Sequence, residues 1–238
     1  MNNCGDSLMV EQDLFQSLDG GSIPTSPLQL FFRKIQQANA NRVFTKFHYA
    51  HRAVPISECF GAYKVDKMQT LVGAISFGKP ASNSLCEGCC GKENAYRIFE
   101  LNRLWMSNEC PKNSESRFIG WSLRILKQLH PDWILVSYAD TEQNHSGAIY
   151  RATGWIYTGL SAERMEWRER GTNKHSKSVT ENRKWEDYST DPNMEFVERS
   201  RKHRYFYFFN KKDVELLKYP IIKFDNTITT NQHYLREG

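Results

Sequence analysis

Runs of apolar residues from Leu28 onward predict the elements of an α/β fold. The segments CFGAYKV and TLVGAISFG predict two paired strands joined by a turn at residues 66–69, and IFELNRLWM predicts a third strand. In SESRFIGWSLRILKQLH, apolar positions recur at helical spacing from Phe118 to Leu129 and predict an amphipathic helix. WILVSYAD is an apolar strand of the kind found at the centre of a sheet.

The elements on either side complete this pattern. LQLFF predicts a short N-terminal strand, and a helix and loop follow it as far as HYAHR. After WILVSYAD come a short helix, NHSGAIYRATG, and a strand, WIYTG. The order strand–helix–strand–helix–strand requires crossover connections and predicts three α/β/α layers around a central mixed sheet. From about Ser161 to Arg204 the periodic signals fade, and RYFYFF then predicts a last strand.

Composition divides the 238 residues, which carry a net charge of +5, into three parts. Residues 1–27 contain four acidic residues and no Lys or Arg, and they are predicted to form a flexible acidic tail. Residues 28–160 are the predicted catalytic core. Residues 161–238 are a predicted basic, aromatic-rich C-terminal extension that packs on the core or completes it. Within it, residues 163–212 hold thirteen Lys or Arg against nine Asp or Glu, which hints at a polyanionic partner.

Membrane and metal signals are weak. No apolar run approaches the roughly 20 residues of a membrane-spanning helix, and the N-terminus lacks a signal-peptide pattern. We therefore expect a cytoplasmic protein whose six cysteines are reduced thiols. LCEGCCG brings Cys86, Cys89 and Cys90 together, but Cys59 and Cys110 do not make the second pair that a structural zinc site needs. We expect a glycine-rich loop with incidental thiols there rather than a metal site, and a transient iron or zinc ion at the active site is left open as an alternative.

The stretch LVSYADTEQNHSGAIYRATGW carries candidate chemistry. Asp140 ends a strand, where open α/β sheets place their ligands. Asn144 opens the following helical pattern and could cap it, and a helix N-terminus suits a phosphate or a developing oxyanion. Tyr150 could aim its hydroxyl at the same crevice. On position alone the ordinary alternative is favoured, in which Asp140 and Asn144 cap and Tyr150 packs.

The pattern N-x-x-x-A-x-x-Y-x-x-x-G-W between two strands resembles the closing βαβ segment of the GNAT acyltransferase superfamily. This resemblance implies a GNAT-like fold in which the Asn and Tyr of the motif serve an acyl-thioester cofactor. KNSESR, at residues 112–117, stands where GNAT enzymes carry a glycine-rich loop that binds pyrophosphate. The hydroxyls of Ser114 and Ser116 could replace some of the amide contacts of that loop.

Other motifs resemble the phage Mom family of DNA-modification proteins. They are ELNRLWM with NSESRFIG, SYADTEQNHSGAIYRAT, HYAHR and, near the C-terminus, KHS, RKHRYFYFF and LKYP. The resemblance covers roughly residues 28–224. It implies conversion of adenine in DNA to its N6-(carbamoylmethyl) form, which shields phage DNA from host restriction enzymes. The site residues that it implies are His48, Tyr49, Arg103, Ser114, Ser116, Asp140 and Tyr150.

The chemistry of these side chains is compatible with such roles. Adenine in a duplex must be extruded before it reacts, and we expect Asp140 to accept its N6 proton or to hydrogen-bond it. His48 is a candidate general base, and Tyr49 or Tyr150 would assist the leaving group. The expected donor-binding residues are Arg103, Ser114, Ser116 and Asn144. The structural alternatives are an ion pair for Arg103, with Glu100 or Glu115, and ring packing for His48 and Tyr49.

The C-terminal part alternates basic and aromatic residues in RMEWRERG, NRKWEDY and RSRKHRYFYFF. Lys and Arg can bind phosphates, and aromatic rings can stack on unpaired bases. The expected DNA-binding residues are Lys174, His175, Arg201, Lys202 and Arg204. The alternative is a core strand whose charges are simply solvated.

The acyl donor is left open between acetyl-CoA and an activated glycine such as glycyl-tRNA. Acetyl transfer would not supply the additional nitrogen of the product, whereas a glycyl group on N6 is an isomer of the carbamoylmethyl group. The expected partners are double-stranded DNA and, with an aminoacyl donor, tRNA. Two rival functions remain, a GNAT-type N-acyltransferase acting on a small amine or protein, and a DNA-binding module without catalysis.

Overall fold

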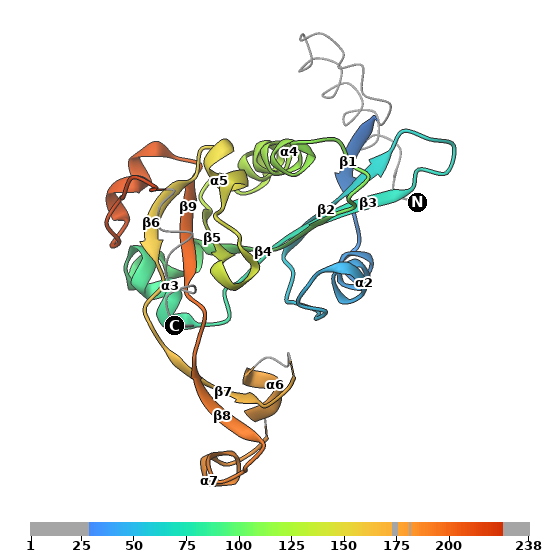
Figure 1. Ribbon diagram of the computed structural model, residues 1–238. Helices are drawn as coiled ribbons and strands as arrows, with labels where there is room; N and C mark the ends of the chain where they lie inside the picture. The colour runs from blue at the N-terminus through green and yellow to red at the C-terminus, as the bar shows by residue number, and fades with distance from the viewer. Residues whose placement is uncertain (1–28, 173–175, 181, 226–238) are drawn as a thin grey trace, which may run out of the picture. The chain divides into compact units, whose positions relative to one another are not determined.

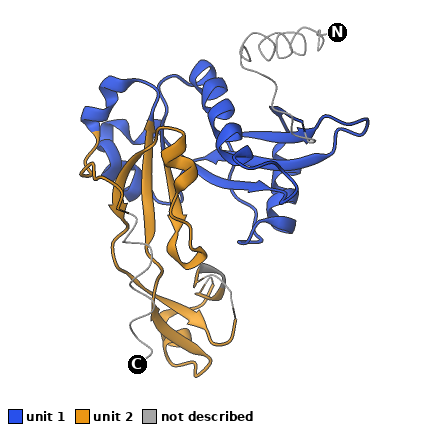
Figure 2. Ribbon diagram, turned by 45° about the horizontal axis from the view of Figure 1, so that its top comes forward, with its two compact units in different colours: residues 1–135, 208–216 blue, residues 136–207, 217–238 orange. Residues whose placement is uncertain are grey.

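The computed structural model describes residues 29–172, 176–180 and 182–225. The chain forms two compact units, drawn in different colours in Figure 2. Unit 1 is Met1–Leu135 with Phe208–Leu216, and unit 2 is Val136–Tyr207 with Leu217–Gly238. The predicted acidic tail, and Lys174 and His175, lie outside the described residues.

Unit 1 contains four antiparallel strands in the order β1-β2-β3-β4. They are β1 (Leu30–Lys34), β2 (Glu58–Lys64), β3 (Leu71–Gly78) and β4 (Ile98–Met106). The predicted β2–β3 hairpin is confirmed. Its turn is held by Asp66, whose Oδ1 accepts hydrogen bonds from the amides of Met68 (3.1 Å) and Thr70 (3.2 Å). On β4, Arg103 pairs with Ser76 immediately before a shift in register.

Helices cover both faces of these strands (Figure 1). They are α2 (Gln37–Phe47) and α4 (Ser114–Leu129). α2 buries Phe44 in a cluster with Ala74 of β3, whereas Phe118 of α4 stacks on Phe32 of β1 with ring centroids 4.7 Å apart. Successive residues of a strand point to opposite faces, so both layers draw on the same strands. The predicted three-layer α/β arrangement is therefore confirmed in unit 1.

The cysteine-rich stretch is helical, so the expectation of a glycine-rich loop is wrong. α3 spans Asn83–Cys90, and the Ser82 hydroxyl caps it by accepting a hydrogen bond from the Leu85 amide (3.3 Å). The three thiols at positions 86, 89 and 90 share one face and are buried there. No group of His, Cys, Asp or Glu that could hold a metal ion occurs among the described residues.

The remaining elements of unit 1 tie residues 208–216 to its strands. They are the 3₁₀ helices η1 (Lys92–Arg97) and η3 (Lys211–Leu216). Arg97 forms an ion pair with Asp213 of η3, and its Nε donates to the carbonyl oxygen of Asp132 (2.8 Å).

Unit 2 contains three strands in the order β5-β9-β6. They are β5 (Ile134–Asp140), β9 (Lys202–Phe208) and β6 (Ile156–Leu160). The 3₁₀ helix η2 (Thr141–Gln143) and the short helix α5 (Ala148–Ala152) lie between β5 and β6 in the chain. The three strands predicted from WILVSYAD, WIYTG and RYFYFF are thus confirmed.

Regular structure is present among the described residues of 161–204, where the periodic signals of the sequence fade. These residues form β7 (Met165–Glu169), α6 (Ser176–Thr180), α7 (Trp185–Ser189) and β8 (Met194–Glu198). β7 and β8 form an antiparallel pair in which Trp167 lies opposite Phe196. A two-stranded ribbon buries little surface, and its strands therefore show only a weak apolar alternation.

A final segment, Leu217–Asp225, packs on the strands of unit 2. The Ile222 amide donates to the carbonyl oxygen of Tyr157 on β6 (3.0 Å), and the Phe224 ring lies 5.0 Å from that of Tyr157. No helix among the described residues is long and apolar enough to span a membrane.

Candidate functional site

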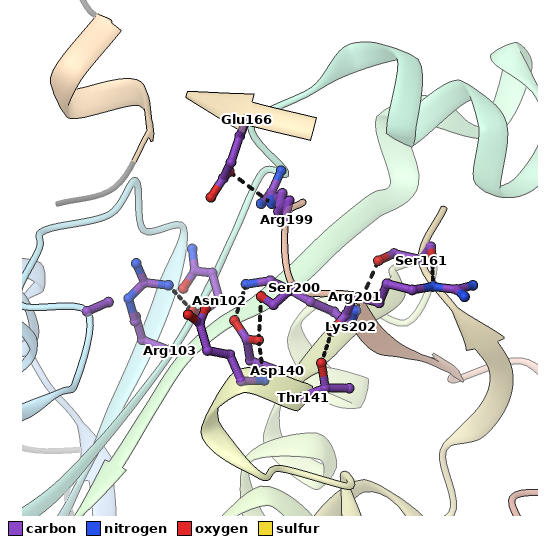
Figure 3. Close-up of polar contacts among 12 residues, drawn as sticks. Asn102, Arg103, Asp140, Thr141, Ser161, Glu166, Arg199, Ser200, Arg201 and Lys202 are labelled. Atoms are coloured by element: carbon purple, nitrogen blue, oxygen red, sulfur yellow. Dashed lines mark hydrogen bonds and ion pairs between the residues drawn. The ribbon is translucent and has the colours of Figure 1, made fainter. Parts of the chain in front are cut away.

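Asp140 lies at the end of β5, and three donors surround its carboxylate (Figure 3). Its Oδ2 is 2.7 Å from Nζ of Lys202. Its Oδ1 accepts hydrogen bonds from the Ser200 hydroxyl (2.9 Å) and the Glu142 amide (3.1 Å). All four residues belong to unit 2. Lys202, 62 residues further along the chain, was expected to bind DNA and is here the counter-ion of Asp140.

This environment fixes the charge of Asp140. Burial, at 8% exposure, raises the pKa of the carboxyl group, but the hydrogen bond and charge of Lys202 oppose burial. With the hydrogen bonds from Ser200 and Glu142, they hold the pKa of Asp140 below its ordinary value. Asp140 is therefore ionised at neutral pH, a weak base and a strong hydrogen-bond acceptor.

The loop after Asp140 is held from two directions. The amide and the hydroxyl of Thr141 both donate to the carbonyl oxygen of Arg201 (3.3 and 2.7 Å). Arg168 of β7 forks onto the carboxylate of Glu142 (3.1 and 3.3 Å). A bidentate guanidinium–carboxylate pair restricts orientation as well as distance. The β7–β8 ribbon therefore helps to fix the position of Asp140.

Asn144 does not cap α5, so that prediction is wrong. It adopts a left-handed conformation (φ 54°) at the end of η2, and its amide donates to the carbonyl oxygen of Thr141 (3.0 Å). The residue before α5 is Gly147 (φ 71°), where an added Cβ would lie 2.3 Å from the Tyr205 ring. Asparagine tolerates the left-handed region. Because Asn144 and Gly147 both adopt this conformation, the helix does not begin until Ala148. A donor-binding role for Asn144 stays a prediction.

Tyr150 is buried on α5, at 6% exposure. Its hydroxyl accepts a hydrogen bond from the Ser137 hydroxyl (2.8 Å), and its ring lies 5.2 Å from those of Trp155 and Tyr205. These contacts fit the packing role that its position favoured.

Arg151, Ser146 and Tyr205 form a neighbouring hydrogen-bond network that the sequence pattern did not predict. Nη1 of Arg151 donates to the carbonyl oxygen of Ser146 (2.6 Å) and to the hydroxyl of Tyr205 (2.9 Å). The Tyr205 hydroxyl in turn donates to the same Ser146 carbonyl oxygen (2.6 Å). The turn before α5 is thus held by β9, whose Tyr205 lies 59 residues away from Ser146 in the chain.

The predicted DNA-binding cations on β9 and just before it are engaged within unit 2. Arg201 pairs with Glu163 (3.1 Å), and Lys202 pairs with Asp140. Arg204 is buried, and its Nε donates to the Thr158 hydroxyl (2.9 Å). A buried, hydrogen-bonded guanidinium favours a structural role for Arg204. DNA binding by these residues stays a prediction.

In unit 1, Arg103 has an incompletely satisfied guanidinium. Its Nη1 donates to the carbonyl oxygen of Asn102 (2.6 Å), but its buried Nε has no hydrogen-bond partner among the described residues, and no carboxylate there pairs with it. The pKa of Arg103 lies below its ordinary value, and burial is the largest cause. The charge of Arg52 also lowers the pKa, whereas Tyr49 and Glu100 raise it. A buried cation with an unused donor suits an anionic ligand.

His48 and Tyr49 follow α2. Nδ1 of His48 accepts a hydrogen bond from the Ala50 amide (3.1 Å), so in the neutral ring Nε2 carries the hydrogen and donates. His48 is buried, whereas Tyr49 is 49% exposed, and the centroids of the two rings lie 4.3 Å apart at a tilt of 32°. Tyr49 is therefore more accessible to a ligand than Tyr150.

The hydroxyls at the start of α4 are used within the turn that precedes the helix. Ser114 donates to the carbonyl oxygen of Pro111 (2.6 Å), and Ser116 donates to that of Asn113 (3.0 Å). Asn113 itself is left-handed (φ 67°). The hydroxyl hydrogens are thus not available to a pyrophosphate in this conformation. Backbone amides of this 16-residue helix remain the better anion donors at this end.

Residues 29–226 match the sequence profile of the Mom protein family. The chain belongs to this family.

One curated relative is the methylcarbamoylase Mom of Escherichia phage Mu, 27% identical over 122 residues. The matched region is 50% of this chain and 49% of the relative, so the chain spans about half the length of the curated relative that it matches.

Several solved structures resemble this Mom family member. An N-acetyltransferase from Staphylococcus aureus has a TM-score of 0.43 at 10% identity and covers 76% of this chain and 99% of its own. A ribosomal-protein-S5-alanine acetyltransferase from Vibrio fischeri has a TM-score of 0.44 at 8% identity, with 80% and 98% covered. A spermidine N-acetyltransferase from Vibrio cholerae has a TM-score of 0.45 at 11% identity, with 78% and 96% covered.

In this Mom family protein, the predicted site residues fall into two groups. Unit 1 holds His48, Tyr49, Arg103, Ser114 and Ser116, and unit 2 holds Asp140, Asn144, Tyr150, Arg201, Lys202 and Arg204. Within unit 1, Tyr49 is close enough to Arg103 to affect its pKa. Within unit 2, Lys202 joins Asp140. A crevice shared by the two groups stays a prediction.

Proposed function

We propose that this protein is a transferase that converts adenine in DNA to N6-(carbamoylmethyl)adenine and so protects phage DNA from host restriction. Membership of the Mom family over residues 29–226 is the observation that carries this proposal. The identity with the methylcarbamoylase of phage Mu supports it.

Asp140 would bind the amino group of the extruded adenine. Adenine N6 is a poor nucleophile because its lone pair is delocalised into the ring. Once that lone pair forms a bond to the incoming group, however, the N–H becomes strongly acidic. A carboxylate with a lowered pKa, such as that of Asp140, is then basic enough to take the proton. Lys202 and Ser200 would act through Asp140 by holding its carboxylate ionised and in one orientation.

Arg103 would bind an anionic group of the acyl donor. Its unused Nε and the absence of a paired carboxylate among the described residues fit a phosphate, which both acetyl-CoA and an aminoacyl-tRNA carry. Attack of N6 on the activated carbonyl carbon of the donor would form the new N–C bond and release the thiolate of coenzyme A or the hydroxyl of tRNA. A glycyl group attached in this way is an isomer of the carbamoylmethyl group and would have to rearrange to give the product. Tyr49 and the Nε2–H of His48 would donate hydrogen bonds near this position, where negative charge develops.

Replacement of Asp140 tests the proposal. DNA from bacterial cells expressing the chain should contain the modified adenine, detected by mass spectrometry of nucleosides. Asp140→Asn keeps the size of the side chain but removes its charge and basicity, and we expect modification to fall by about 100-fold or more. Asp191→Asn is the matched control, since Asp191 of unit 2 is also ion-paired, with Arg183 at 2.8 Å, and lies outside the proposed site.

Two results would contradict the proposal. Unmodified DNA from cells expressing soluble wild-type chain, together with acylation of small amines or proteins by that chain, would favour the N-acyltransferase alternative. Normal modification by a folded Asp140→Asn variant would remove Asp140 from the reaction.

A second experiment addresses the donor. Purified protein and DNA are incubated with acetyl-CoA or with glycyl-tRNA, and the nucleosides are then analysed. We expect the donor that supports modification to lose its effect with Arg103→Met and to regain part of it with Arg103→Lys, because lysine restores the charge without the forked geometry.

A further inference from the structure

The outer face of α2 and the loop after it form a basic surface that lacks acidic residues. Residues 33–57 contain five Lys or Arg residues and no Asp or Glu. We call Arg42, Lys46, Phe47 and Arg52 the α2 surface. The inward face of α2 buries Ala40, Val43 and Phe44, which leaves the polar residues on the opposite face.

The cations of the α2 surface are not neutralised within the described residues. Arg42 and Lys46 are exposed and lie one helical turn apart, and Arg52 is exposed on the loop that follows. None of the three forms an ion pair with a described carboxylate. Arg201 and Lys202, in contrast, are each paired with an acidic residue. Contact with a polyanion gives a larger favourable binding free energy for cations that are not already paired with an acid.

An open surface hollow of about 570 Å³ lies along the outer face of α2. It is lined by Ala38, Asn41, Arg42, Thr45 and Lys46. Asn41 also exchanges two hydrogen bonds with the backbone of Val54 (3.0 and 3.3 Å). These bonds hold the loop that bears Arg52 to α2.

Exposed aromatic rings lie at the C-terminal end of the same helix. Phe47 is 47% exposed, and its ring stacks on that of Trp105 at 4.7 Å. Lys46 places its ammonium group 4.9 Å from the same Phe47 ring. Trp105 supports the Phe47 ring from behind, so the ring is a firm platform on which an unpaired base can stack once the Lys46 ammonium group turns from the ring to a phosphate.

We propose that the α2 surface binds the phosphate backbone of the duplex DNA substrate. Arg42, Lys46 and Arg52 bind phosphates, and Phe47 stacks on a base that is no longer paired. This inference rests on the proposed function, which makes DNA the substrate, and it assigns the DNA contact to a part of the chain other than the C-terminal basic residues.

The test measures binding rather than catalysis. Full-length wild-type protein and the Arg42→Gln, Lys46→Gln double variant are titrated onto a labelled duplex over a range of salt concentrations, and fluorescence anisotropy is recorded. Each phosphate contact contributes about 0.9 to the slope of log K against log salt, so the loss of two contacts should lower the slope by about 1.8. Between the ends of a fourfold range of salt concentration, this difference changes the ratio of wild-type to variant affinity about tenfold, and the larger ratio is at low salt.

A second double variant controls for net charge. Arg124→Gln with Lys127→Gln removes two exposed cations from α4 and should leave the slope unchanged. Circular dichroism and thermal melting of each variant establish that it is folded. Phe47→Leu should preserve the slope yet weaken binding to a duplex with an unpaired adenine more than binding to a fully paired one.

The outcomes separate this inference from the proposed function. If wild-type protein binds the duplex and the α2 double variant binds it with the same affinity and slope, the α2 surface is not the contact, and the function stands. An equal loss in both double variants would also overturn the assignment, since it would reflect net charge alone. If the same titration onto labelled tRNA shows the loss and titration onto the duplex does not, the surface binds RNA instead. Failure of wild-type protein to bind duplex DNA at any salt concentration would contradict the proposed function itself.

Discussion

Replacement of Lys202 by methionine removes the cation that pairs with Asp140. The carboxylate then keeps two donors, the Ser200 hydroxyl and the Glu142 amide, in a position where Asp140 is 8% exposed. Methionine has a similar length and an apolar end, so it fills the space of the lysine stem without replacing its charge. The substitution therefore tests the charge of Lys202 rather than its bulk.

The expected loss of stability follows from the burial of the pair. Removal of one partner from a fully buried ion pair costs about 3–5 kcal/mol, and an exposed pair contributes about 0–1 kcal/mol. The side chains of Lys202 and Asp140 are 28% and 10% exposed, which places this pair between the two limits. We expect the free energy of unfolding at neutral pH to fall by about 2 kcal/mol.

This loss should depend on pH in a defined direction. In the wild type the folded pKa of Asp140 is lowered, so its stabilising contribution is present above the unfolded pKa of about 3.9 and is lost as pH falls through the folded pKa. Without Lys202, the largest contribution opposing burial is removed, so the folded pKa rises and the stability that ionised Asp140 contributes at neutral pH is lost. Below the folded pKa of the wild type, Asp140 is protonated in both proteins, and the difference should shrink toward zero.

Urea unfolding of both proteins at neutral, mildly acidic and strongly acidic pH measures this difference. Lys202→Arg retains the charge and should lose less than about 1 kcal/mol. In the double variant Asp140→Asn, Lys202→Met, the unpaired charge is absent, so part of the lost stability should return. A loss that has the same size at neutral and strongly acidic pH would refute the reasoning, because it would arise from packing rather than from the ion pair.

Two further predictions concern positions that support the units. Gly147→Ala forces alanine to adopt φ 71° and places its Cβ 2.3 Å from the Tyr205 ring, so we expect thermal melting to show a loss of more than about 2 kcal/mol. Burial raises the pKa of Glu58, but Lys34 (2.8 Å) and His130 (3.1 Å) together lower it by more, so the net shift of the pKa is downward. The stability that Glu58 contributes is present above its unfolded pKa and lost as pH falls through its folded pKa. Glu58→Gln should therefore cost about 1 kcal/mol in chemical unfolding at neutral pH and almost nothing in strong acid.

The sequence determined the elements whose residues repeat with a strong period. β2, β3 and β4 are the three predicted strands, and α4 occupies the predicted amphipathic stretch from Ser114 to Leu129. Each of these elements buries one face or both, and burial imposes the apolar spacing that sequence analysis detects. Membership of the Mom family could also be recognised from the sequence, because short motifs spread along the chain occur in a specific combination.

Backbone conformations without a side-chain period were decided by the tertiary structure. Asn144 and Gly147 both adopt positive φ, and so the helix that Asn144 was expected to open begins at Ala148. The β7–β8 ribbon was missed because its strands are five residues long and bury little surface.

The ionisation state of Asp140 could not be predicted from the sequence either. Asp140 was predicted from its place at the end of a strand, but its carboxylate is held ionised by Lys202 and Ser200, about 60 residues further along the chain. Sequence spacing does not determine which distant cation meets a buried acid, since the pairing of strands brings them together. Position along the chain therefore identified the acid, and only the folded arrangement of β5 and β9 decided its partner and its protonation state.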